Sequence, residues 1–229
     1  MPKMIGLRLH EVKDQCVEPD SGWKPIGFTI REENLMEYPL ELAFKILAMT
    51  PQISVTDASG RLVFYVKLKM FKLKELVTIF SDEEQNRPLY YINADRVIDF
   101  SARYHFTDLN GTNLGSVKRE GMRSIWKAHY NVFAGEALVM QIREEKPWVK
   151  VADGCIGQIP IVGLLSGFFF HPAYLVSRPD GPVVMRLEKQ PSFFESKFTI
   201  KKERDLDELE ETRVLLSLMM MILFERARG

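Results

Sequence analysis

Cysteines, long apolar runs and an excess of either charge are all scarce in this chain of 229 residues. Its two cysteines, Cys16 and Cys155, provide neither a disulfide framework nor a metal cluster, which fits a reducing compartment. Lys plus Arg and Asp plus Glu number 31 each, so no overall field points to nucleic acid or to an acidic substrate. The N-terminal residues carry charges where a signal peptide needs an unbroken apolar core. We therefore expect a cytoplasmic protein that binds no nucleic acid.

Catalytic and metal-binding patterns are missing as well. The histidines are scattered, and no His or Cys pair has metal-ligand spacing. The segment Gly163–Gly167 contains a serine, but this serine stands one place too late for a nucleophile elbow. Asp57 and Asp108 resemble paired carboxylates, yet both stand at turn positions where Asp accepts hydrogen bonds from its own backbone. The sequence therefore predicts no catalytic residue, no metal site and no cofactor.

The apolar run Val214–Phe224 is the feature around which the chain is organised. Only Ser217 interrupts it, and it lies in a predicted helix over residues 205–226 whose flanks are charged. A helix that is apolar on all sides is buried on all sides, but a bilayer span needs roughly 17–25 apolar residues. At about 1.5 Å per residue, the run is close in length to an ordinary β-strand. We expect a barrel of short strands closed around this helix. The alternative is an ordinary core helix of a mixed fold.

The predicted helix carries boundary signals of its own. Asp205 followed by Glu208 predicts a capping box at its start, and Arg226 near its end complements the helix dipole. The Ser217 hydroxyl is expected to bond the carbonyl of Arg213, one turn earlier.

A strand–turn–strand pattern occurs three times. Its turns are 57–60, 108–111 and 177–181, each with a glycine where positive φ is expected. Further strands are expected at 40–46, 73–80, 89–92, 97–102, 125–133, 136–143, 148–151 and 194–200. Roughly a dozen strands can close into a barrel that encloses a helix. We expect a mainly β fold, a closed antiparallel β-barrel of about twelve strands. Residues 1–34 would form an N-terminal arm, and residues 35–229 the barrel with its central helix.

Two segments resemble a known family. The run from Val117 to Tyr130 is similar to a segment of the LURP-one-related proteins, and so is the run from Arg178 to Ile200 ahead of an apolar C-terminal helix. These proteins belong to the superfamily that holds the tubby C-terminal domain and the phospholipid scramblases. The resemblance covers about residues 35–228. It implies a closed antiparallel barrel of twelve strands around a central C-terminal helix.

For function, the resemblance implies contact with phospholipid. Tubby domains bind phosphoinositide head groups and scramblases act on phospholipids, whereas many members have no known activity. This chain lacks the acidic calcium-ligand spacing and the cysteine-rich palmitoylation segment expected of a scramblase, which argues against scrambling.

Basic residues follow each of the three turns at related places. The sets are Lys67, Lys69, Lys72 and Lys74; Lys118, Arg119, Arg123 and Lys127; and Lys197, Lys201, Lys202 and Arg204. At similar heights around a barrel they would form an anion-binding band for lipid head groups. The alternative is strand alternation, in which lysines face water and protect strands against edge pairing. The second set, interleaved with Trp126 and Tyr130, is the predicted binding site.

The apolar segment Ile156–Phe170 has two possible roles. It is either a plug or lid on a barrel mouth, or an exposed loop that touches lipid or a protein partner. Taken together, the sequence predicts a non-enzymatic barrel that binds an anionic phospholipid or a membrane surface, peripheral to the membrane. The alternative is a structural or protein-interaction domain with no small ligand.

Overall fold

A computed structural model describes residues 36–45, 50–68, 76–95, 102–120, 129–145, 173–191 and 195–227. All of them belong to the unit Met36–Gly229. The predicted arm over residues 1–34, the apolar segment Ile156–Phe170 and the strand predicted at 148–151 lie outside the described residues, and so does the strand predicted at 97–102 except for its last residue.

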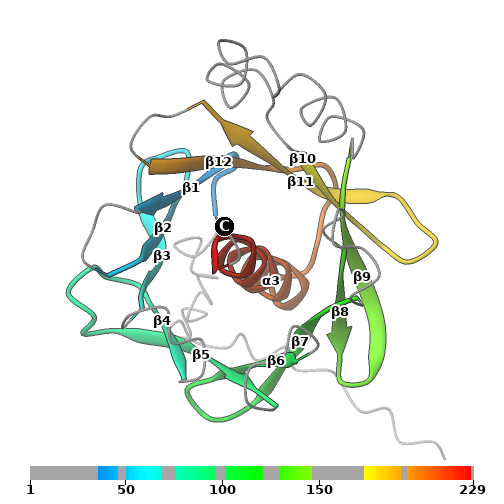
Figure 1. Ribbon diagram of the computed structural model, residues 1–229, viewed down its shortest axis with the longest axis horizontal. Coiled ribbons are helices and arrows are strands. Elements are labelled where there is room, and N and C mark those ends of the chain that lie inside the picture. The colour runs from blue at the N-terminus through cyan, green and yellow to red at the C-terminus, as the bar shows by residue number, and fades with distance from the viewer. Residues whose placement is uncertain are drawn as a thin grey trace, which may run out of the picture. The chain divides into compact units, whose positions relative to one another are not determined.

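Twelve antiparallel strands form a closed barrel, in which each strand pairs with its neighbours in the chain and β1 closes the ring against β12. The first six are β1 Leu40–Lys45, β2 Gln52–Thr56, β3 Leu62–Lys67, β4 Val77–Phe80, β5 Pro88–Ala94 and β6 Arg103–Asp108. The other six are β7 Asn113–Arg119, β8 His129–Ala134, β9 Ala137–Glu144, β10 Ala173–Ser177, β11 Val183–Gln190 and β12 Glu195–Lys202. The helix α3, Glu208–Ala227, runs inside the ring (Figure 1). The predicted fold class is confirmed.

Side chains alternate between the two faces of each strand, and the apolar ones point inward. In β1, Leu42 and Phe44 are buried whereas Glu41 and Lys45 are exposed, and β2, β10 and β12 show the same period of two. The inward rows meet α3, which is buried at every position over residues 211–224. The helix is apolar on all sides because protein surrounds it on all sides.

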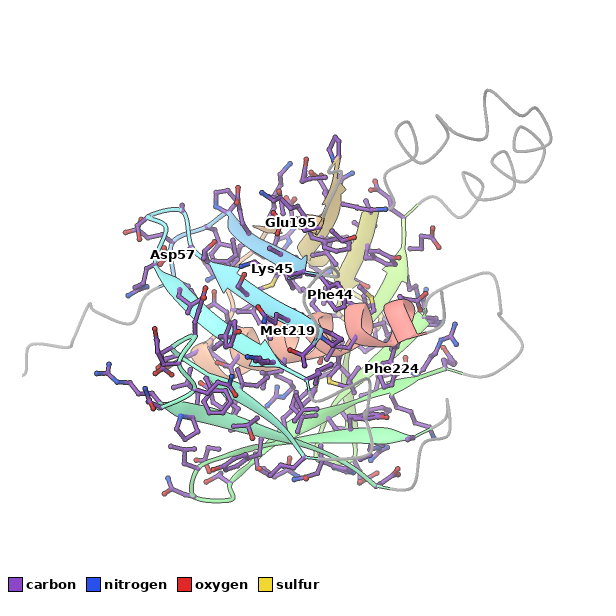
Figure 2. The ribbon with its side chains drawn as sticks, turned by 60° about the vertical axis from the view of Figure 1, so that its left-hand side comes forward. Phe44, Lys45, Asp57, Glu195, Met219 and Phe224 are labelled. Carbon is purple, nitrogen blue, oxygen red and sulfur yellow. The ribbon has the colours of Figure 1, made fainter. Side chains whose placement is uncertain are left out.

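The two ends of the barrel differ. Five short turns at residues 57–61, 81–87, 109–112, 135–136 and 178–182 join strands at one end, the turn end, and α3 begins there. Each of these hairpins has a register shift that leaves one extra residue in the strand after the turn, and such a bulge bends the strands and helps the ring to close. The helix finishes at the opposite end of the barrel. Figure 2 shows Asp57 and Phe224 toward these two ends.

The helix begins later than predicted. Asp207, and not Asp205, caps it, since the Oδ1 atom of Asp207 accepts a hydrogen bond from the Glu210 amide at 2.7 Å. The residues just before are still held by β11, because the amides of residues 203 and 204 both donate to the Val184 carbonyl. The helix can therefore begin only after these residues, and its cap stands two residues later than the capping-box pattern predicted.

Polar side chains in the buried part of the helix have partners. The Ser217 hydroxyl donates to the Arg213 carbonyl at 2.8 Å, as predicted. Arg213 donates from Nε to the Leu114 carbonyl of β7 at 2.6 Å. Glu211 lies 3.4 Å from the ammonium of Lys202. These contacts fix the first turns of α3 to the wall of the barrel at the turn end.

Two of the three predicted turns have the expected chemistry. In each, one carboxylate oxygen of Asp57 or Asp108 accepts hydrogen bonds from the amides two and four residues later, at 2.7 to 3.1 Å. Gly60 and Gly111 have positive φ angles of 83° and 82°. The aspartates therefore organise turns, as predicted, and the glycines supply the left-handed backbone that these turns need.

The third turn differs from the other two. Arg178 stands where they have Asp, and its guanidinium donates two hydrogen bonds to Glu210 at 2.8 and 3.1 Å. This turn is thereby tied to the start of α3. Gly181 does not have the predicted positive φ, because Pro182 follows it and restricts the preceding residue to extended conformations.

Asp57→Asn is expected to destabilise the barrel at neutral pH and to have little effect in acid. The Asp57 carboxylate is enclosed by its turn, and the hydrogen bond from Ser59 is the main cause that holds its pKa below the usual 3.8. A lowered pKa adds stability above the usual value, and this stability is lost as pH falls through the folded-state value. Urea unfolding should show a loss of about 1–3 kcal/mol at neutral pH, shrinking below pH ~4.

The matched control for this prediction is Asp180→Asn in the third turn. Asp180 is exposed, and its carboxylate makes no hydrogen bond with the rest of the described chain. Its replacement should leave the unfolding free energy unchanged at both pH values. An Asp57→Asn loss that is the same in acid as at neutral pH would contradict the assignment of the charge as the stabilising feature.

Candidate functional site

The predicted binding residues Lys118 and Arg119 are neighbours on β7 and point to opposite faces of the barrel wall. Lys118 is half-buried on the outer face, whereas Arg119 points inward with 10% of its side chain exposed. Arg123 and Lys127 lie outside the described residues. The two described members of the predicted site therefore belong to different surfaces, one facing solvent and one facing the interior.

On the outer face, two further lysines lie at the same end of the barrel as Lys118. Lys45 ends β1 and Lys67 ends β3, and strand register places both beside Gln52 of β2. Lys45 and Lys67 are exposed, and in the described part of the chain none of these three lysines has a carboxylate partner. Lys67 belongs to the first predicted set. Lys45 was missed because the predicted sets contain only basic residues that follow a turn, whereas Lys45 precedes the first turn and reaches this place by the pairing of β1 with β2.

The third predicted set does not join them. Lys201 and Lys202 lie near the turn end and pair with carboxylates at 2.9 and 3.4 Å. Lys197 lies at the opposite end and pairs with Glu195 at 3.2 Å, the residue that stands across from Lys45 in the strand register. The expectation of similar heights is wrong for this set, because its members are spread along β12.

Inside the barrel, Arg119 belongs to a polar cluster around the end of α3. The Glu225 carboxylate accepts a hydrogen bond from the Tyr130 hydroxyl at 2.8 Å and lies 4.0 Å from Nη2 of Arg119. The Arg119 guanidinium is 6.0 Å from the centre of the Tyr130 ring. Phe224 packs edge-on against Tyr104 at 4.7 Å and is stacked with Tyr130 at 6.1 Å. We call these five residues the inner cluster.

The two tyrosines of the inner cluster are held in their neutral form. Burial, followed by the nearby Glu225 carboxylate, raises the pKa of Tyr130, so its hydroxyl is available as a donor. Burial is also the main cause that raises the pKa of Tyr104, and the charge of Asp95 adds to it. The Tyr104 hydroxyl is buried and has no hydrogen-bond partner in the described part of the chain.

His129 is fixed on the outer wall by its two ring nitrogens. Nδ1 lies 2.6 Å from the Glu120 carboxylate, and Nε2 accepts a hydrogen bond from Arg143 at 3.1 Å. Burial is the main cause that lowers the pKa of this imidazole. Among the described residues, no group of three or more potential metal ligands lies together. No helix in this part of the chain is long and apolar enough to cross a membrane.

Comparison with known proteins gives a family match. Residues 62–208, more than half of the chain, match the family model for LURP-one-related proteins. No curated protein matches the chain. The X-ray structure of a protein from Arabidopsis thaliana is similar, with 16% identity and a TM-score of 0.44 over 84% of this chain and 94% of that one. The residues that match the family model include Lys118 and Arg119, whereas Lys45 and Glu225 lie outside them.

Proposed function

Because the chain belongs to the LURP-one-related family, we propose that this tubby-like barrel is a non-enzymatic module that binds an anionic phospholipid or a membrane surface. Lys118 and Arg119 would contact the anionic groups, together with Arg123 and Lys127. The protein would act from the cytoplasm, where the facing leaflet is rich in anionic lipid.

The observation that supports this proposal is the uneven pairing of basic side chains. Lys45, Lys67 and Lys118 lie at the end of the barrel opposite the turn end, and none has a carboxylate partner in the described part of the chain. Near the turn end, Lys201 and Lys202 are both paired with carboxylates. In the described part of the chain, the lysines without a carboxylate partner therefore all lie at the end opposite the turn end, whereas the turn end has two exposed arginines without an ion pair, Arg87 and Arg204.

Such an arrangement suits a surface that carries many negative charges. A lysine near an anionic membrane contributes about 1 kcal/mol of binding free energy, so three such lysines together contribute ~3 kcal/mol. This attraction acts over a Debye length of ~8–10 Å at physiological salt and weakens as salt is raised. An uncharged surface offers these lysines no comparable gain.

Replacing Lys45, Lys67 and Lys118 together by Gln is expected to weaken binding to anionic vesicles roughly 100-fold, the equivalent of ~3 kcal/mol. The measurement is co-sedimentation of the purified protein with phosphatidylcholine vesicles and with vesicles that also contain phosphatidylserine, at low and high salt. Wild type should bind only the anionic vesicles, and high salt should release it.

The control removes the same charge from the turn end, by replacing Arg87, Lys201 and Arg204 with Gln. All three are exposed, and this variant should keep most of its vesicle binding. No binding to anionic vesicles at low salt would reject the proposal and favour a protein-interaction barrel. Binding that ignores salt would also reject it, and would turn attention to the apolar segment Ile156–Phe170.

A further inference from the structure

The Arg119 side chain is largely enclosed by the barrel, and its guanidinium has few partners. Its side chain is 10% exposed, and its ion pair is the 4.0 Å approach to Glu225. In the described part of the chain it donates no hydrogen bond, although a guanidinium has five N–H donors. Enclosed charged groups are normally paired and hydrogen-bonded, because an unpaired one costs free energy. This arginine therefore has donors to spare.

The side chains around Arg119 offer more donors on the same inner surface. Tyr130 is its direct cross-strand neighbour on β8, and Tyr104 on β6 stands opposite Val117, two residues earlier on β7. The Tyr104 residue is 1% exposed, and its hydroxyl has no partner in the described chain. A guanidinium and two tyrosine hydroxyls thus come from three adjacent strands, and one of the hydroxyls is unused.

Glu225 stands in an unusual place for an acid. It lies in the last turn of α3, where the partial negative charge of the helix end disfavours a carboxylate. The Tyr130 hydroxyl and Arg119 are the groups that offset this cost. The position therefore holds a negative charge in spite of the helix dipole, and this charge is carried on a side chain that is 28% exposed and close to the barrel end.

From this geometry we infer that the inner cluster is a binding site for a phosphate group, in which the phosphate replaces the Glu225 carboxylate as the partner of Arg119. A guanidinium matches two phosphate oxygens at once, and the hydroxyls of Tyr130 and Tyr104 can serve the others. A carboxylate ligand has only two oxygens for these donors, so phosphate is the better match. Both a phospholipid head group and free phosphate have this chemistry.

This inference deepens the proposed function and rests on it for the lipid source of the phosphate. The outer lysines would bring the barrel to an anionic surface, and Arg119 would receive one phosphate from that surface. Glu225 then acts as an internal competitor, because it occupies Arg119 and repels an incoming anion. The structure thereby predicts that removing the Glu225 charge improves phosphate binding, a gain that a purely structural ion pair would not give.

The experiment measures binding of inorganic phosphate to the full chain by titration calorimetry or NMR, in parallel with vesicles that contain phosphatidic acid. Glu225→Gln keeps an oxygen for the Tyr130 hydroxyl and should tighten phosphate binding about tenfold or more. Arg119→Gln should abolish phosphate binding. Arg119→Lys should keep only part of it, because an ammonium lacks the two parallel N–H donors of the guanidinium. Tyr104→Phe should weaken it several-fold without lowering the melting temperature. Lys201→Gln, an exposed lysine near the turn end, should leave phosphate binding unchanged.

The outcomes separate this inference from the proposed function. Tighter phosphate and vesicle binding by Glu225→Gln supports both. Vesicle binding that needs the outer lysines but does not respond to Glu225→Gln or Arg119→Gln overturns the inference and leaves the proposed function standing. Phosphate binding that depends on Arg119, without any vesicle binding, supports the site and rejects the membrane as its source. Wild-type protein and Glu225→Gln that both fail to bind phosphate overturn the inference outright.

Discussion

A chain shortened to end at Val214 is expected not to fold. The shortening removes nine large apolar side chains between Leu215 and Phe224, each no more than 8% exposed. Replacing one such side chain by Ala costs ~2–5 kcal/mol, whereas a whole domain is stable by about 5–15 kcal/mol. The barrel cannot collapse to fill the space, because its strands are closed into a ring. Circular dichroism and urea titration of the truncated chain should show no cooperative transition.

Single substitutions in the same helix test this prediction in a chain that still folds. Leu216 is fully buried, and Leu216→Ala should cost about 2–5 kcal/mol in urea unfolding. Leu209 in the first turn of α3 is 44% exposed, and Leu209→Ala should change stability by less than ~0.5 kcal/mol. A truncated chain that stays monomeric and unfolds cooperatively would defeat the central role of the helix. Improved solubility of the truncated chain would indicate a membrane anchor instead.

The fold could be predicted because its signals are local. Asp57 and Asp108 each begin a turn whose hydrogen bonds lie within four residues, so the residues that decide the turn are neighbours in the sequence. The apolar run of α3 is likewise contiguous. Its length excluded a bilayer span and its all-round apolar character required an enclosing wall. Together, these two features of the helix predict a closed barrel around it.

The candidate site could be predicted only in part, because it depends on contacts between distant residues. Glu225 is 95 residues from Tyr130 in the chain, yet the two share a hydrogen bond. Lys118 and Arg119 were grouped because they are adjacent, but adjacency within a strand sends side chains to opposite faces. Because a strand was expected here, the separation of these two adjacent side chains could have been predicted from strand geometry alone. The approach of Glu225 to Arg119 could not, because it requires the position of the helix end within the barrel.

The helix position is itself set by one close contact. Arg213 of α3 crosses Gly115 of β7 to reach the Leu114 carbonyl, which its Nε contacts at 2.6 Å. A Cβ atom on Gly115 would lie 2.5 Å from Nε of Arg213 and 2.5 Å from the backbone oxygen of Phe133 on β8. The backbone oxygen cannot move without opening the pairing of β7 with β8. Gly115 is therefore the point where helix and wall come closest among the glycines with described surroundings.

Gly115→Ala is accordingly expected to lower the unfolding free energy by about 3–5 kcal/mol. Three costs add: the backbone strain of a φ of +133°, the overpacking against β8, and the disturbed hydrogen bond of the buried Arg213 side chain. The control is Gly111→Ala in the same hairpin, where φ is +82° but nothing lies within 4 Å of the new Cβ atom. That variant has the strain alone and should lose ~1–2 kcal/mol in the same urea titration. Equal losses for the two variants would show that the backbone conformation, and not the contact with Arg213 and β8, makes Gly115 necessary, and the position of α3 would then need another explanation.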